Sequence, residues 1–305
     1  MLAYTLKRSF VAFLILIVVS GLTFSLSHLS ADPALTIGGE QASDEDIEAI
    51  RILYGFDRPI YEQYFSWLGR ALQGDFGESY HYKAPVVEMI SGRIGTTMTL
   101  GVLAILFALI ISIPLGTLAA MRPNSIIDRF ALLIAVFGQA LPTFWFALMM
   151  IIVCGVWWRW VPISGNTTWA HFVMPTIALG YYATPALMRL TRAGLIEVLG
   201  SDYIRTARAK GLSPTVVLFK HALRNAIIPV VALAAVWFGF MLGGSIVIET
   251  IFNLKGLGWL SYDALLRSDL PVVQAIVLIF ASFYVVLTLL ADLLNAWLDP
   301  RISVR

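Results

Sequence analysis

The densest group of residues that could take part in recognition chemistry lies at positions 201–229, in the sequence SDYIRTARAKGLSPTVVLFKHALRNAIIP. Ser201 and Asp202 can cap a short helix, which Gly211 can end in the left-handed conformation that glycine adopts at low cost. Ser213 and Pro214 then supply a second start signal. Asp202 is outnumbered by the basic residues Arg205, Arg208, Lys210, Lys220 and Arg224. Two start–stop signals this close together predict two short helices at an angle, a compact docking element, with a plain solvated basic loop as the alternative.

The sequence contains no recognisable active-site pattern. A phosphate-binding loop of the form GxxxxGK[ST] is absent, so any ATP hydrolysis must take place on another polypeptide. Ser164 is better explained by a turn after Pro162 than by a protease nucleophile, because no histidine is placed within an apolar run to act as its base. The histidines lack the spacing of a helical zinc pair: His28, His81, His171 and His221. We therefore predict no catalytic residue, metal or cofactor on this chain.

One acidic residue, Glu249, stands at the end of an apolar run, shortly after Gly243 and Gly244. Charges near a membrane interior usually face a cavity, so these three residues are candidates for lining a translocation path. An anchor at the membrane interface explains Glu249 equally well, and the glycine pair is more typical of close helix packing. Both interpretations stay open from the sequence alone.

Composition places the chain in a membrane. It has 305 residues, of which 59% are hydrophobic and 13% are charged, whereas soluble domains carry about a quarter charged residues. The mean hydropathy is +0.81. A net charge of +2 is too small to indicate a nucleic-acid partner, and the single cysteine, Cys154, excludes an intrachain disulfide. Such a chain must bury its surface in lipid or against other membrane helices.

Six apolar runs are long enough to cross about 30 Å of hydrocarbon as helices. They predict an all-α membrane protein with spans at 10–26, 100–120, 130–158, 172–190, 226–248 and 272–290. A signal peptide is the alternative for the first run, but the run is long for one and is followed by a poor cleavage site. We therefore expect residues 1–30 to form a retained N-terminal transmembrane helix.

Residues 31–94 form a different, hydrophilic segment with eleven acidic and five basic residues. Ser43 with Asp46 resembles a capping box and predicts a helix that ends near Gly55. A second helix is expected from Pro59 to Gln73, with Gly74 as its stop signal. The remaining boundaries are a five-helix core at 95–298, which contains the basic loop 194–225, and a tail at 299–305.

The distribution of basic residues predicts the orientation of the chain. Lys7 and Arg8 place the N-terminus in the cytoplasm, which puts the acidic segment 31–94 outside. The next positive loop, with Arg122 and Arg129, then falls inside. The strongly basic stretch between the fourth and fifth spans is also inside, as is the C-terminal tail with its two arginines. Six spans and the positive-inside rule agree at every loop.

The strings RTARAKGLS and HALRNAIIP resemble the coupling ("EAA") loop of bacterial ABC importer permeases, in the variant found in peptide, glutathione and nickel permeases. The general pattern has Glu, Ala and Ala where this chain has Arg205, Thr206 and Ala207. Two of these positions depart from it, but they agree with the peptide-family version. Further similarity lies in LYGFDRPIYEQY, GDFGES, GGSIVIETIF and the DPRI ending, so the resemblance extends over nearly the whole chain.

The resemblance implies a permease subunit of an ATP-driven, binding-protein-dependent importer in the bacterial inner membrane. It implies four kinds of partner: a second homologous permease, two cytoplasmic ATPase subunits that hold ATP and Mg, a periplasmic substrate-binding protein, and lipid. The loop would then dock on one ATPase through Ser201, Asp202, Tyr203, Arg205, Thr206, Ala207, Arg208, Lys210, Gly211, Ser213, Pro214, His221 and Arg224.

Two other classes of function remain to be weighed against this one. A stand-alone secondary transporter or channel often shows inverted repeats and broken helices with ions at the membrane midplane, and neither is evident here. A membrane-embedded hydrolase would need a nucleophile with a base, which the sequence does not supply. The cargo stays undetermined among short peptides, glutathione, nickel chelates and opines, with short peptides favoured by the family.

Overall fold

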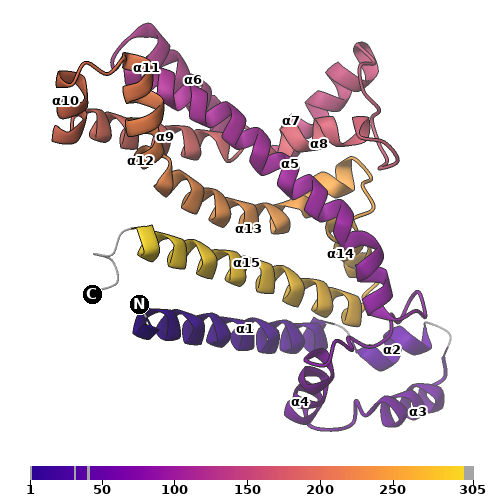
Figure 1. Cartoon of the computed structure of the whole chain (residues 1–305). Coiled ribbons are helices and arrows are strands. Elements are labelled where there is room, and N and C mark those ends of the chain that lie inside the picture. The colour runs from indigo at the N-terminus through magenta and orange to yellow at the C-terminus, as the bar shows by residue number, and fades with distance from the viewer. Residues whose placement is uncertain (1, 31, 40–41, 299–305) are drawn as a thin grey trace.

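The computed structural model describes residues 2–30, 32–39 and 42–298, and most of them lie in helices (Figure 1). Within these ranges the only β pairing is an isolated antiparallel bridge between Glu78 and Pro85. A helix satisfies its own backbone N–H and C=O groups, which is why long apolar segments fold this way in lipid. The expected all-α class is confirmed. The predicted tail at 299–305 lies outside the described residues.

Four helices are long and apolar enough to cross a membrane: α1 (Leu2–Ser30), α5 (Val86–Met121), α13 (Ile228–Ile251) and α15 (Leu270–Leu298). Helices α1 and α15 pack side by side, α13 packs on α15, and α5 runs diagonally across the bundle (Figure 1). Helix α1 begins and α15 finishes at the end of the bundle that carries α10 (Asp202–Ala209), here called the α10 end. The opposite end carries α14 (Leu257–Leu266) and is called the α14 end.

The predicted span at 130–158 is wrong as a single helix. It consists of α6 (Ile126–Ala140), α7 (Thr143–Met150) and the π-helical turn η1 (Ile151–Trp157), with a bend of 100° between α6 and the rest. Proline lacks an N–H and pushes the residue before it out of the helical region. Leu141 is accordingly extended, with ψ of 126°, and Pro142 takes the position just before α7. These pieces together make one span at most.

The predicted span at 172–190 is also interrupted. Helix α8 (Ala170–Gly180) is too short to cross a membrane alone, and a turn separates it from α9 (Thr184–Leu199). Pro185 lies in the first turn of α9, where its missing N–H costs nothing. The described residues thus contain four helices that could span a membrane, or five with the bent pair, and the count of six is not confirmed.

Small residues let α5 approach α8 and α9 closely at the centre of the bundle. A Cβ on Gly180 would lie 2.5 Å from the carbonyl oxygen of Ala104, and one on Gly116 would lie 2.7 Å from that of Met188. Small residues at helix contacts are typical of membrane proteins, where dispersion rather than the hydrophobic effect favours association. The surrounding core is apolar and includes the fully buried Leu100, Ala108 and Leu187.

The acidic segment folds into three short helices at the α14 end: α2 (Pro33–Gly38), α3 (Asp44–Tyr54) and α4 (Ile60–Ala71). The capping box of Ser43 and Asp46 is present, and Gly55 ends α3 with φ of 72°, as predicted. Helix α4 ends at Ala71, and Gly74 follows in a left-handed turn with φ of 84°. The segment is fastened to α1, since Tyr64 lies 2.9 Å from the Ser20 hydroxyl and packs edge-on against Phe24.

We expect Gly180→Ala to destabilise the protein, because the added methyl group would press on the backbone of α5. Overpacking of this kind costs about 1–3 kcal/mol in free energy of unfolding. The matched control is Gly92→Ala, at a helical position of α5 with nothing within 4 Å of the added atom. Thermal unfolding in detergent would measure both variants. Equal unfolding temperatures for the two would contradict the close approach of α5 and α8.

Candidate functional site

The basic segment forms two helical pieces that fold against each other at the α10 end. Helix α10 is followed by one continuous helical stretch made of α11 (Pro214–Val216), the π-helical turn η2 (Val217–Leu223) and α12 (Arg224–Ala226). A small core joins the pieces to the ends of α5 and α9. It contains the buried side chains of Ala120, Leu195, Ile204, Ala207, Val217, Leu218, Ala222 and Ala226. The two helices are therefore fixed to the bundle by their apolar faces; we call residues 201–226 the docking element.

The predicted caps are mostly in place. Gly211 is left-handed with φ of 76°, and its N–H donates to the Arg208 carbonyl at 2.9 Å. Ser213 accepts from the Val216 N–H at 3.4 Å, and Pro214 opens α11. Ser201 occupies the position before α10, but its hydroxyl donates to the Val198 carbonyl at 2.6 Å instead of capping the helix. The prediction that the Ser201 side chain caps α10 is therefore wrong.

The outer surface of the docking element is basic. Arg205, Arg208, Lys210 and Arg224 are exposed, while Ala207 points into the small core. Asp202 pairs with Arg205 at 3.1 Å, with both side chains open to solvent. Exposed pairs of this kind add at most about 1 kcal/mol to stability. The charges are thus free to meet a partner, and the fold of the element does not depend on them.

On the solvent-exposed side, hydrogen bonds join α10 to the helical stretch formed by α11, η2 and α12. The Tyr203 hydroxyl donates to the His221 carbonyl at 3.4 Å and accepts from the Asn225 amide at 2.8 Å. Asn225 also donates to the His221 carbonyl at 3.3 Å. Tyr203 and His221 were predicted site residues, whereas Asn225 was not. Its position four residues after His221, on the same helix face, was the signal that could have indicated it.

A second residue pair near this end was missed by sequence reasoning. Arg192 of α9 makes a bidentate contact with Asp128 of α6, at 2.6 and 2.7 Å. The Asp128 side chain is only 2% exposed and also accepts from the Asn124 N–H at 2.9 Å. Bidentate arginine–carboxylate pairs are among the strongest charge-assisted contacts, so this one fixes α6 to α9 beside the docking element. The sequence signal for this pair was that Asp128 is the one acidic residue between Arg122 and Arg129.

Glu249 is fully buried at the α14 end and is held by several donors. Its carboxylate accepts from the Thr97 hydroxyl of α5 at 2.7 Å and from the Trp259 N–H at 2.9 Å. Thr97 in turn accepts from the Leu257 N–H at 2.8 Å. These N–H groups belong to the first turn of α14, where helix donors lack partners within the helix. Glu249 and Thr97 together cap α14 from neighbouring helices.

The two glycines before Glu249 lie on an open face of α13. Nothing is within 4 Å of a Cβ placed on Gly243, and only Leu179 comes near one on Gly244. Gly244 lines a cavity of about 500 Å³ at the break between α6 and α7, and Glu249 does not line it. Aromatic side chains form much of the wall: Phe144, Tyr182, Trp237 and Phe240. The Tyr181 hydroxyl donates to the freed Leu141 carbonyl at 2.6 Å beside it.

Known protein families and relatives match this chain over nearly its whole length. Residues 112–304 match the family described as binding-protein-dependent transport system inner membrane component, and residues 1–101 match the N-terminal family of such membrane components. The glutathione transport system permease protein GsiC of Escherichia coli strain K12 is 40% identical over 306 residues, covering 100% of both chains. The protein of the same name from Shigella dysenteriae gives the same values.

The fold is also similar to that of a solved structure with low sequence identity to this chain. A chain of the MetNI methionine ABC transporter in inward-facing conformations superposes with a TM-score of 0.57 at 18% identity. The match covers 69% of this chain and 96% of that one. At this level of identity the likeness concerns the fold, and it extends over the greater part of this chain.

We expect Glu249→Ala to destabilise the α14 end, because the Trp259 N–H and the Thr97 hydroxyl would lose their buried acceptor. Each unsatisfied buried group costs about 1–3 kcal/mol. Thermal unfolding and hydrogen exchange at Trp259 would report the loss, and Glu249→Gln, which keeps one acceptor oxygen, should fall in between. The control is Glu88→Ala, an exposed acid in the first turn of α5. Unchanged exchange at Trp259 would contradict the capping role.

Proposed function

We propose that this chain, which belongs to the family of binding-protein-dependent transport system inner membrane components, carries a short peptide of the glutathione type. It is a permease subunit of a binding-protein-dependent ABC importer. The observation that carries the proposal is the 40% identity to a glutathione permease over the full length of both chains. The chain is a multi-pass protein of the inner membrane. It works with ATPase and substrate-binding protein partners.

The finer assembly is part of the proposal. One copy pairs with a second homologous permease, two cytoplasmic ATPase subunits bind ATP and Mg and hydrolyse the nucleotide, and a periplasmic binding protein delivers the cargo. The absence of a GxxxxGK[ST] sequence supports placing hydrolysis on the partner. The open, glycine-bearing face of α13 supports a permease–permease contact, since glycine lets helices approach closely.

We further propose that the α10 end faces the cytoplasm and the α14 end the periplasm, with both chain termini inside. The basic docking element and the acidic helices α2–α4 lie at opposite ends, as the positive-inside rule requires. Helices α8 and α9 then cross the membrane together and complete six passes. The domain boundaries follow at residues 1–30, 31–94, 95–298 with loop 194–225, and 299–305.

The docking element has apolar faces and basic faces with different contacts, and this arrangement supports a coupling role. Its apolar faces join it to α5 and α9, while its basic faces stay exposed for an ATPase surface. A rigid element fixed to several helices transmits a push as a rigid-body shift, which is one way that two conformations are coupled. We propose that ATP-driven closure of the ATPases moves this element, and with it the helices that open the path.

The translocation path is proposed to run beside the cavity at the α6–α7 break. Irregular backbone at membrane depth is tolerated where it is buried or lines a cavity, and Leu141–Pro142 is such a place. Gly244 lines this cavity and Gly243 borders it on the open face of α13. Glu249 lies outside the cavity, and its part in the path would be to hold α14 and α13 in register.

Uptake by the reconstituted importer tests the cargo. Proteoliposomes that contain both permeases, the ATPases and the binding protein should accumulate reduced glutathione or trialanine only when ATP is supplied to the ATPase side. Free glycine is the control solute and should not accumulate. Uptake that runs without ATP and follows an ion gradient would contradict the importer mechanism and favour a secondary transporter. ATP-driven uptake of neither peptide would contradict the proposed cargo.

Gly211→Val should uncouple transport from ATP hydrolysis without preventing membrane insertion. A β-branched residue at φ of 76° is strained by about 1–2 kcal/mol, and nothing in the described part of this chain is within 4 Å of the added Cβ. We expect the strain to distort the turn and to lower ATP-driven uptake in proteoliposomes. Gly211→Asn is the matched control, because asparagine tolerates the left-handed conformation. Normal transport by the valine variant would remove the argument for Gly211.

A further inference from the structure

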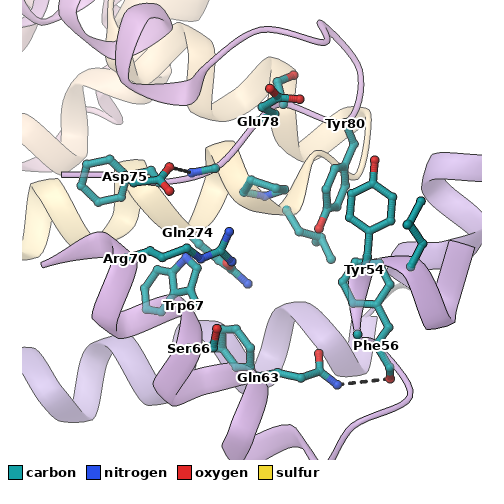
Figure 2. A pocket seen from close by; sticks show the side chains of 18 of the residues that line it. Tyr54, Phe56, Gln63, Ser66, Trp67, Arg70, Asp75, Glu78, Tyr80 and Gln274 are labelled. Carbon is teal, nitrogen blue, oxygen red and sulfur yellow. Dashed lines mark hydrogen bonds between the residues drawn. The ribbon is translucent and has the colours of Figure 1, made fainter. Parts of the chain in front are cut away.

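A second cavity lies at the α14 end, away from both the docking element and the α6–α7 break (Figure 2). Its volume is about 680 Å³, within the range of 300–1,000 Å³ that is usual for small-molecule sites. Its walls come from α1, α3, α4, the loops on both sides of α4, and the first two turns of α15. Segments far apart in the chain thus converge on one space.

Two side chains whose donors have no partner among the described residues line this cavity. Gln274 of α15 is 4% exposed, lines the cavity and makes no side-chain hydrogen bond with any described residue. Trp67 of α4 is 6% exposed, and its indole N–H is buried without an acceptor. Unsatisfied buried polar groups are uncommon in native proteins because each costs free energy. The Trp67 N–H is enclosed by protein, whereas the unpartnered Gln274 amide can donate to a ligand that supplies an acceptor in this space.

A positive charge stands beside these donors. Arg70 lines the cavity, and its guanidinium forms no ion pair or hydrogen bond with the described residues. Figure 2 shows Arg70 with Gln274 and Trp67 around the same space. Burial, and then the charge of Asp269, raises the pKa of Tyr80 above its ordinary value, so its hydroxyl stays protonated. This side of the cavity suits a carboxylate.

The rim carries acidic groups as well. Glu62, Asp75 and Glu78 line the cavity, and none of them is in an ion pair with a described residue. Asp75 uses one oxygen to accept from the Gly77 N–H at 2.8 Å, which leaves the other open. The cavity thus carries acidic groups and a cationic donor, which match a ligand with both an amino group and a carboxylate.

Hydrogen bonds made by residues of the walls hold the walls in place. Asp269, just before α15, is fully buried and accepts from the Ser79 hydroxyl and from the Tyr80 N–H, the latter at 3.0 Å. On the opposite wall, Gln63 donates to the Arg58 carbonyl at 2.8 Å. The loop between α4 and α5 is thereby fastened to α15. A site built on fixed elements binds its ligand at a lower entropic cost.

We propose that this cavity binds a short zwitterionic peptide on the outer side of the permease, with Gln274 and Arg70 holding its carboxylate and the acidic rim holding its amino group. The ligand class rests on the proposed function, whereas the site itself rests on the unpartnered donors. The peptide is held beside the membrane-spanning helices, at a place distinct from the cavity at the α6–α7 break.

Equilibrium dialysis tests this site without the binding protein. The assembled permease–ATPase complex in lipid nanodiscs should bind radiolabelled trialanine and reduced glutathione saturably. Arg70→Gln removes the positive charge and Gln274→Ala removes the amide donor, and each should weaken binding about tenfold. Ser66→Trp fills the cavity and should abolish binding while leaving Arg70 and Gln274 in place. The matched control is Gln73→Ala, a residue of the same segment that does not line the cavity and should bind as the unmodified complex does.

The outcomes separate this inference from the proposed function. Absence of saturable binding, or binding that Ser66→Trp leaves unchanged, overturns the site. If ATP-driven uptake of the same peptides persists in that case, the importer function stands and the cavity alone is refuted. Thermal unfolding of each variant identifies any that is misfolded. Saturable binding lost in Ser66→Trp and weakened in Arg70→Gln, with Gln73→Ala unchanged, establishes the site.

Discussion

Backbone hydrogen-bonding groups inside a membrane must find partners within the protein, and the irregular parts of this chain are arranged around that requirement. At the α6–α7 break, the carbonyl of Leu141 is freed by the proline that follows it and accepts from the Tyr181 hydroxyl. At the start of α14, the orphan N–H groups are satisfied by Glu249 and Thr97 from two other helices. Each interruption is thus fixed by a side chain from a different part of the chain.

This arrangement gives the molecule two ends with different chemistry, joined by α13. One end presents basic residues on short helices that are anchored by an apolar core. The other end collects buried carboxylates, Glu249 and Asp269, which fasten loops and short helices to the bundle. Helix α13 follows directly after α12 of the docking element and carries Glu249 near its other terminus. A displacement at one end therefore has a continuous helical connection to the other.

Much of this architecture could be predicted from local sequence. The helix start at Ser43, the turn at Gly211 and the proline at position 214 follow from residues whose backbone preferences are strong. The long spans at α5, α13 and α15 follow from runs of apolar residues. Apolar length, however, does not distinguish a straight helix from a bent one. The run at 130–158 reads as continuous, yet Pro142 divides it, while Pro114 remains inside α5 without ending it.

The sequence by itself determined the class of protein, the basic docking element and the family, because these depend on composition and on motifs that are contiguous in the chain. Only the tertiary structure decided what Glu249, Asp128 and Gln274 do. Glu249 meets Thr97 across 152 positions and Asp128 meets Arg192 across 64. Gln274 lines a cavity together with residues of α4, some two hundred residues earlier in the chain. Such contacts arise from packing between distant segments, which no local pattern records.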